Sequence, residues 1–168
     1  PRYFIFRDEH GEEIGRAGSL WVLLDVNTRK MAKPDICAAL MPDNSDLTPP
    51  MGMPSTVYEP VATPVTDTYF PRYTDMDMNK HVNNTKYIDW CCNALGIDVM
   101  QKHELSSFSL NYHQEIRPGQ QIRTELRQDG PIFSFSGFEG SIRHFDAGGT
   151  LRPIENLPED TSCLESLA

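Results

Sequence analysis

One helix-length apolar stripe constrains the fold of this chain more than any other feature. The residues that share the stripe recur at i, i+3, i+4, i+7 and i+8, a spacing that places them on one helix face. They are Tyr87, Trp90, Cys91, Ala94 and Leu95. Asn84 stands just before them as the expected N-cap. Because a helix with one apolar face must bury that face, the neighbouring segments have to supply the surface that covers it.

The segments after this helix alternate as strands do. Residues 107–116 alternate strictly between apolar and polar side chains, with Glu115 on the polar side. Further strands are expected at 65–73, 121–127, 132–138, 141–145 and 151–154. A turn is expected at Gly148-Gly149. One central helix followed by an antiparallel meander predicts an α+β fold with the sheet wrapped around the helix.

The N-terminal part of the chain also contains strand patterns, followed by a proline-rich stretch. Residues 2–7 and 13–26 are rich in aromatic and β-branched side chains and flank a turn at 8–11, which predicts a hairpin. Both faces of the second strand are largely apolar, as in a strand covered on both sides. A short helix is expected at 34–40. Residues 42–64 hold six prolines and no Lys or Arg, so we expect an extended linker there.

Composition and charge exclude several classes of protein. The net charge of −9 lies in residues 34–68 and 153–168, which contain no Lys or Arg, and this argues against general nucleic-acid binding. No apolar run approaches the roughly 18 residues that span a membrane. The four cysteines form no C-x-x-C, and no histidine pair has ligand spacing with a carboxylate. We therefore expect no metal and no other cofactor, and a reducing compartment.

A polar loop leads directly into the start of the helix. Asp77, Asn79 and His81 alternate there as carboxylate, amide and imidazole, the groups that hydrolytic chemistry uses. Taken alone, such a trio is also typical of an ordinary loop or cap. The longer string Asp-x-Asn-x-His-Val-Asn-Asn-x-x-Tyr-x-x-Trp, from Asp77 to Trp90, resembles the signature of the acyl-acyl carrier protein thioesterases of plants and bacteria.

The resemblance extends to both sides of this signature. His-Glu-Leu-Ser-Ser at 103–107 is similar to the family's segment after the helix, and residues 3–34 look like the last strands of a preceding domain. Members of the family carry two hotdog domains in tandem, in which a sheet wraps around a central helix. The resemblance thus implies part of a first hotdog at 1–41, a linker at 42–64, a complete catalytic hotdog at 65–158 and an acidic tail at 159–168. We expect the opening strand and central helix of the first hotdog to lie upstream, in a longer chain.

The family's catalytic positions correspond to Asp77, Asn79, His81 and Glu115. A thioester is hydrolysed when a base takes a proton from water, donors hold the oxyanion and the carbonyl is held in place. The resemblance implies Glu115 as general base, with Asp77 orienting its partners and sharing that role, because two carboxylates in one site titrate as a pair. Asn79 would hold the water or the thioester oxygen. His81 would donate to the carbonyl or carry a proton to the leaving thiolate.

The start of the helix offers backbone N–H groups as donors for an oxyanion. The backbone N–H groups of Val82 and Asn83 are the candidates for the oxyanion hole, because helix N-termini favour negative charge.

A covalent alternative would pair Cys91 or Cys92 with His81. Cys92 lies about 12 Å along the axis from the helix start, and Cys91 falls in the apolar stripe. We therefore expect a buried structural role for both cysteines.

The activity implied by the resemblance is hydrolysis of fatty acyl-acyl carrier protein thioesters to free fatty acids, which ends chain elongation. Two alternatives stay open: the same chemistry on acyl-coenzyme A, and a noncatalytic hotdog that binds acyl thioesters. Arg72, Lys80 and Lys86 surround the loop and are expected to meet the phosphopantetheine arm or an acidic carrier helix. A cytoplasmic location fits this role, as does the plastid stroma for a plant source, and a homodimer is compatible with it.

Overall fold

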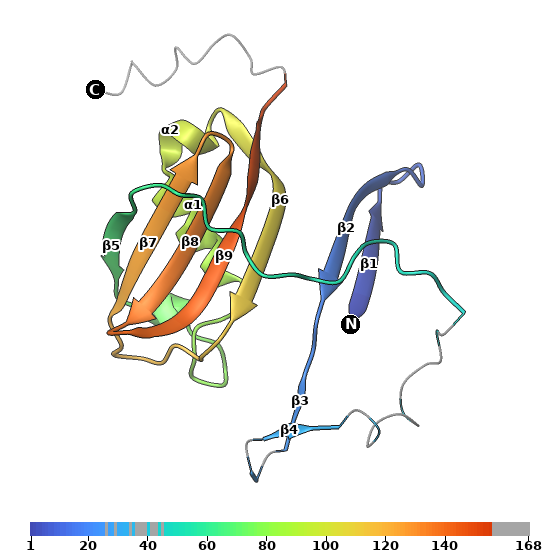
Figure 1. The fold of residues 1–168 in the computed structure, drawn as a ribbon, viewed down its shortest axis with the longest axis horizontal. Helices are drawn as coiled ribbons and strands as arrows, with labels where there is room; N and C mark the ends of the chain where they lie inside the picture. Colours follow the sequence, from blue (N-terminus) through green and yellow to red (C-terminus); the bar gives the residue numbers. More distant parts are fainter. Residues whose placement is uncertain are drawn as a thin grey trace. The chain divides into compact units, whose positions relative to one another are not determined.

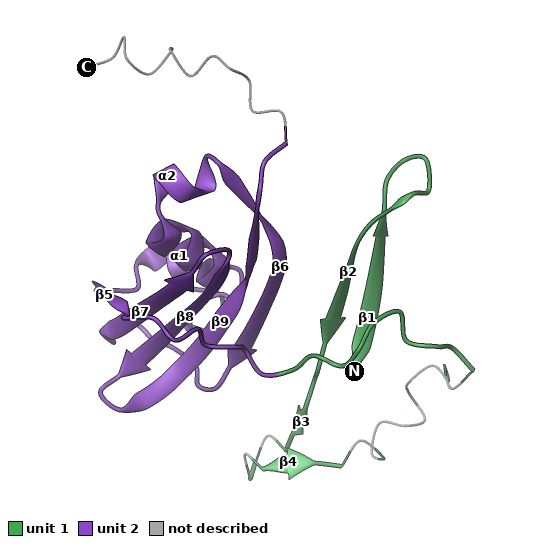
Figure 2. Cartoon of the chain, turned by 45° about the horizontal axis from the view of Figure 1, so that its top comes forward, with its two compact units in different colours: residues 1–55 green, residues 56–168 purple. Residues whose placement is uncertain are grey.

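The computed structural model describes residues 1–25, 27–28, 30–33, 35, 40, 44 and 46–155. Two compact units divide the chain, residues 1–55 and residues 56–168 (Figure 2). No helix within the described ranges is long and apolar enough to cross a membrane. All four candidate catalytic residues belong to the second unit.

The first unit is built on a β-hairpin. Its strands are β1 (Arg2–Arg7), β2 (Glu13–Ser19), β3 (Leu23–Leu24) and β4 (Met31–Ala32). Strand β1 pairs antiparallel with β2, and β3 pairs antiparallel with β4. The Asp8 carboxylate closes the first turn by accepting the N–H groups of His10 and Glu12, each at 2.9 Å. The predicted hairpin is therefore confirmed.

The second strand of this hairpin is shorter than the predicted 13–26. Strand β2 ends at Ser19, and Trp21 is exposed rather than covered. The indole N–H of Trp21 donates to the Ser19 hydroxyl at 2.9 Å, and the Arg2 guanidinium lies 5.0 Å from the centre of its ring. These polar partners suit an indole at a surface. The helix expected at 34–40 lies mostly outside the described residues.

The second unit is a five-stranded antiparallel sheet with a helix against one face (Figure 1). Its strands are β5 (Val65–Tyr69), β6 (His103–Tyr112), β7 (Ile122–Asp129), β8 (Ile132–Glu139) and β9 (Ile142–Pro153). Its helices are the 3-10 helix η2 (Tyr73–Asp75) and the α-helices α1 (Lys86–Leu95) and α2 (Ile97–Met100). The strands are ordered β5-β7-β8-β9-β6, so the strand that follows the helices in sequence forms one edge of the sheet.

The predicted helix stripe forms the core of this unit. All of its members are buried except Ala94. The rings of Tyr87 and Trp90 meet Phe145 of β9 edge-on, with centroids 4.9 and 6.3 Å apart. Burying each large apolar side chain stabilises the fold by about 1.5–3 kcal/mol. Ala94 instead lines a hollow of about 220 Å³ between α1 and β5, which explains its exposure.

The turn predicted at Gly148-Gly149 is wrong. Strand β9 runs straight through both glycines and pairs there with β6 on one side and β8 on the other. A Cβ atom on Gly149 would collide with the carbonyl oxygen of Ser107. The glycine is therefore present for the close approach of β6 to β9 rather than for a turn.

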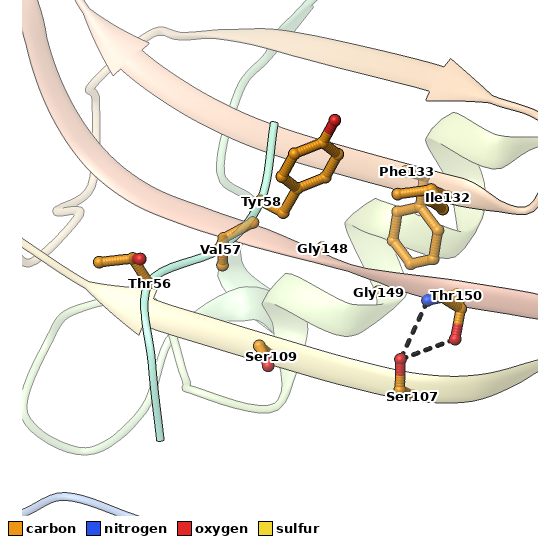
Figure 3. Close-up of a pocket in the computed structure, with 10 residues that line it drawn as sticks. All are labelled: Thr56, Val57, Tyr58, Ser107, Ser109, Ile132, Phe133, Gly148, Gly149 and Thr150. Atoms are coloured by element: carbon orange, nitrogen blue, oxygen red, sulfur yellow. Dashed lines mark hydrogen bonds between the residues drawn. The ribbon is translucent and has the colours of Figure 1, made fainter. Parts of the chain in front are cut away.

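Residues 56–64 cross the face of the sheet that is turned away from α1 (Figure 1). The segment is extended, as its proline content predicts. Arg127 donates to the carbonyl oxygen of Ala62 at 2.6 Å, and Arg143 forms an ion pair with Glu59 at 2.7 Å. A hollow of about 350 Å³ beneath the start of the segment is lined by Thr56, Val57, Tyr58 and residues of β6, β8 and β9 (Figure 3). This part of the expected linker thus packs on the second unit.

Candidate active site

The loop before α1 is folded back on itself, so that alternate side chains come together. Met76 and Val82 form an isolated antiparallel bridge. Inside that bridge, the N–H of Asp77 donates to the carbonyl oxygen of His81 at 2.9 Å, and the N–H of Lys80 donates to that of Asp77 at 3.1 Å. Lys80 adopts a left-handed conformation, with φ of 62°, which the tight reversal requires. The candidate residues therefore project from one compact turn.

The Asp77 carboxylate is the centre of this turn. It accepts the backbone N–H of Asn79 at 2.8 Å and lies 3.5 Å from the Asn79 side-chain nitrogen. His81 Nδ1 lies 3.2 Å from the other oxygen of Asp77, and the two side chains are only 24% and 20% exposed. Because Asp77 holds Nδ1, Nε2 is the atom of the imidazole that remains to face a substrate. The loop trio is thus brought together, with Asp77 orienting the other two residues.

Strand β6 ends before it reaches Glu115. It stops at Tyr112, not at residue 116 as the alternation predicted, because the N–H groups of His113 and Gln114 both donate to the carbonyl oxygen of His144, at 2.8 and 3.0 Å. Strand β9 carries an irregularity against β8 at this point, and such bulges commonly terminate strand pairing. Glu115 therefore lies in a connector rather than on a polar strand face.

The connector nevertheless lies beside the loop that carries Asp77, Asn79 and His81. The N–H of Val82, next to His81, donates to the carbonyl oxygen of Ile116, next to Glu115, at 2.8 Å. The pKa of the Tyr87 phenol, in the first turn of α1, is raised to about 12 by burial and, to a smaller extent, by Tyr112 and the charge of Glu115. The hydrogen bond from Val82 to Ile116 places the connector beside the start of the helix.

The Glu115 carboxylate itself is exposed to solvent. Its side chain is 51% exposed and accepts a hydrogen bond from Arg117 Nη2 at 3.0 Å. Arg117 is a neighbour that sequence reasoning missed. The signal was a basic residue two positions after the candidate base and directly before a Pro-Gly turn.

The two backbone groups expected to form an oxyanion hole are already in use. The N–H of Val82 donates to Ile116 as described, and the N–H of Asn83 donates to the carbonyl oxygen of Asp75 at 2.8 Å. Neither proton is free to meet an oxyanion in this structure. The expectation for Val82 and Asn83 is therefore not supported, because both groups build the loop instead.

The helix also begins one residue later than predicted. Its N-cap is Thr85 rather than Asn84. The Asn83 side-chain oxygen accepts both the N–H and the hydroxyl of Thr85, each at 3.0 Å, which forms a local turn before the helix. The Asn84 carbonyl oxygen accepts the hydroxyl of Tyr112 at 3.0 Å, so β6 is tied to the same end of the helix.

The three basic residues expected to meet the carrier differ in their surroundings. Lys80 and Arg72 are exposed at the turn and just before η2. Lys86 is half-buried and pairs with Asp89 at 3.1 Å, on the same helix. An ion pair with this much access to solvent is weak, so Lys86 can still exchange its partner for another anion.

Cys91 has the surroundings of a structural residue, whereas Cys92, which was also expected to be buried, is only partly buried. Cys91 is fully buried, and burial, with a smaller contribution from Cys92, raises the pKa of its thiol to about 12. Burial and then Asp89 also raise the pKa of the Cys92 thiol. A thiol with a raised pKa supplies little thiolate, which argues against the covalent alternative. Among the described residues, no group of three His, Cys, Asp or Glu side chains could hold a metal ion.

Comparison with known proteins identifies the family. The model of the acyl-ACP thioesterase C-terminal domain matches residues 58–142, which is half of the chain and includes all four candidate catalytic residues. The chain belongs to the acyl-ACP thioesterase family. The chain is 31% identical over 121 residues to the chloroplastic palmitoyl-acyl carrier protein thioesterase of Arabidopsis thaliana, covering 68% of this chain and 29% of that protein. It spans about three tenths of the length of the curated relatives that it matches.

Solved structures confirm the predicted hotdog fold. The 12:0-ACP thioesterase from Umbellularia californica superposes with a TM-score of 0.71 at 25% identity, over 90% of this chain and 62% of that one. An acyl-ACP thioesterase from Bacteroides thetaiotaomicron gives a TM-score of 0.75 at 24% identity, over 89% of this chain and 61% of that one. The five-stranded sheet around α1 is therefore the predicted hotdog.

Proposed function

We propose that this protein hydrolyses fatty acyl-acyl carrier protein thioesters and releases free fatty acids. The observation that carries the proposal is the convergence of the Asp77, Asn79 and His81 loop with the Glu115 connector, joined by the Val82 to Ile116 hydrogen bond. The family match covers both segments, and the relatives are named as acyl carrier protein thioesterases and hydrolases.

The geometry suggests a division of labour among the four residues. Asp77 is already occupied by the N–H of Asn79 and by His81, which suits an orienting role. Among the described residues, Glu115 has one side-chain partner, the Arg117 guanidinium, and its exposure leaves room for a water molecule. We therefore assign general-base chemistry to Glu115: its carboxylate takes a proton as the water oxygen attacks the thioester carbonyl carbon.

The remaining two residues serve the carbonyl oxygen and the leaving group. The Asn79 amide can donate to the thioester oxygen as it becomes an oxyanion. His81, held through Nδ1 by Asp77, presents Nε2. A protonated Nε2 donates to the same oxygen or passes its proton to the thiolate as the carbon–sulfur bond breaks, and Asp77 stabilises the imidazolium.

The substrate we propose is the acyl group on a carrier protein rather than on coenzyme A. Arg72 and Lys80 are exposed beside the loop, and Lys86 lies in the first turn of α1. Cations in these positions suit the phosphate of the phosphopantetheine arm or an acidic surface of the carrier. We propose residues 65–158 as the catalytic hotdog and residues 1–41 as part of a first one. The protein would work in the cytoplasm, or in the stroma for a plant source, and a homodimer is compatible with this arrangement.

The test compares Glu115→Gln with Glu104→Gln in hydrolysis of a purified acyl-acyl carrier protein. Both residues are about half exposed, and each pairs with one arginine: Glu115 with Arg117 at 3.0 Å and Glu104 with Arg152 at 2.6 Å. Removing a general base lowers kcat by about 10²–10⁴-fold. We expect that loss for Glu115→Gln alone, with unchanged circular dichroism. Equal turnover in the two variants would refute Glu115 as the base.

A further inference from the structure

The connector that carries Glu115 is closed by a tight turn on its C-terminal side. Pro118 and Gly119 occupy the middle of the turn, and Gly119 has a φ of +86°. The N–H of Gln120 donates back to the carbonyl oxygen of Arg117 at 3.3 Å. Proline followed by a glycine with positive φ is the pattern of a type II turn. The backbone immediately after Glu115 and Ile116 therefore has a defined conformation.

The side chain of Gln120 ties this turn to the sheet. Its Oε1 accepts the backbone N–H of Arg117 at 2.6 Å, so the turn is closed from both directions. Its Nε2 donates to Glu139 Oε2 at 2.6 Å. Glu139 is the last residue of β8, so one amide joins the connector to a paired strand. A glutamine can do this because a primary amide is both donor and acceptor.

A buried imidazole, that of His144, lies beside the Glu139 carboxylate. His144 is 2% exposed, and its Nε2 lies 3.8 Å from Glu139 Oε2. Among the described residues, neither ring nitrogen of His144 has a hydrogen-bond partner. The carbonyl oxygen of the same residue holds His113 and Gln114 at the other end of the connector. The two ends of the Glu115 segment are therefore anchored on neighbouring residues of β8 and β9.

We infer that Gln120 is a positioning residue for Glu115, and this inference rests on the proposed function. By fixing the backbone of Arg117 against Glu139, Gln120 fixes where the Arg117 guanidinium meets the Glu115 carboxylate. An exposed carboxylate has many rotamers, so a base in this position needs a rigid neighbour to hold one of them. Gln120 touches neither substrate nor reacting atoms and acts through Arg117.

The test exchanges the two ends of the Gln120 to Glu139 hydrogen bond. Gln120→Glu keeps an acceptor for the Arg117 N–H but places two carboxylates against each other. A displacement of about 1 Å at a catalytic group can cost about 10²-fold, so we expect kcat on acyl-acyl carrier protein to fall by about 10–100-fold, with KM nearly unchanged. Glu139→Gln keeps an acceptor for the Gln120 amide and should stay close to wild type.

The double variant Q120E/E139Q tests whether the hydrogen bond between positions 120 and 139 is what sustains kcat. There the new amide at position 139 can donate to the new carboxylate at position 120, so kcat should recover most of the loss. Wild-type kcat in Gln120→Glu, or a double variant no better than Gln120→Glu, overturns the inference. If Glu115→Gln retains wild-type turnover, the assignment of Glu115 as the general base fails instead. If the wild-type protein does not hydrolyse acyl-acyl carrier protein, the proposed function fails, whatever Gln120 does.

A second measurement does not depend on activity or on the charged variant. Gln120→Leu removes both side-chain hydrogen bonds, and the exchange of the Arg117 amide hydrogen can be followed by NMR. Because that amide donates at 2.6 Å to Gln120, we expect its exchange to become at least about 10-fold faster in the variant, while amides of β7 stay protected. Unchanged exchange of the Arg117 amide would overturn the inference directly.

Discussion

Asp77→Asn tests whether the Asp77 and His81 pair takes part in proton transfer or only maintains the conformation of the loop. In the wild type, the carboxylate lies 3.2 Å from His81 Nδ1 and accepts the N–H of Asn79 at 2.8 Å. An asparagine can keep the bond to Asn79 with its oxygen, but its nitrogen then faces Nδ1. The imidazole must offer a lone pair there, so its proton moves to Nε2.

The expected magnitude follows from this change of tautomer. A neutral imidazole with its proton on Nε2 can donate to a carbonyl but has lost the carboxylate that stabilises the imidazolium. In Asp-His pairs such a replacement costs up to about 10⁴ in kcat, so we expect a loss of about 10²–10⁴-fold. The lost charged hydrogen bonds should also lower the free energy of unfolding by about 1.5–3 kcal/mol.

The assay measures kcat and KM on acyl-acyl carrier protein, together with the ¹⁵N chemical shifts of the His81 ring. Asp25→Asn is the matched control, since Asp25 also organises a loop by accepting the N–H groups of Asn27 at 3.0 Å and Thr28 at 2.7 Å, in the first unit. The control should keep wild-type kcat. If Asp77→Asn shifts the tautomer and leaves kcat unchanged, then His81 carries no proton and the assignment of its role is refuted.

Two further predictions concern packing and the cysteines. Gly149→Ala places a methyl group against the Ser107 carbonyl oxygen and should lower the free energy of unfolding, measured in urea, by about 1–3 kcal/mol. The control is Gly52→Ala, which should leave that free energy unchanged because nothing lies within 4 Å of the added methyl group. Equal urea midpoints for the two variants would contradict the close approach of β6 to β9. Because the pKa of the Cys91 thiol is raised to about 12, its reactive thiolate forms only as the pH nears that value. Iodoacetamide at pH 8 should leave Cys91 of the folded protein unlabelled in mass spectra, and Cys91→Ala should retain turnover; a labelled Cys91 peptide would contradict this.

Patterns confined to one segment predicted the structure well. The stripe from Tyr87 to Leu95 identified the buried face of α1, because helix periodicity is a local property. The alternation of β6 and β7 was also visible in sequence. Sequence reasoning failed where another segment decides the outcome: strict alternation carried the predicted strand on to residue 116, whereas the carbonyl oxygen of His144 ends the pairing after Tyr112.

The candidate site shows the same difference between features set within one segment and features set by contacts between distant segments. Its loop residues were identified from their chemistry and from the family signature, and the bond between Asp77 and His81 is a contact within one turn. The use of the Val82 N–H depends on Ile116, which is far away in sequence. A sequence cannot show that a backbone group is already occupied, because its partner is chosen by tertiary packing.

The sequence by itself determined the family, the central helix with its buried face, and the trio of Asp77, Asn79 and His81. Only the tertiary structure decided where Glu115 lies, that Arg117 holds its carboxylate, and that Gln120 and Glu139 tie the connector to the sheet. The physical reason is that periodicity and motif chemistry are written along one segment. A hydrogen bond between distant segments depends on the path by which the whole chain brings them within about 3 Å of each other.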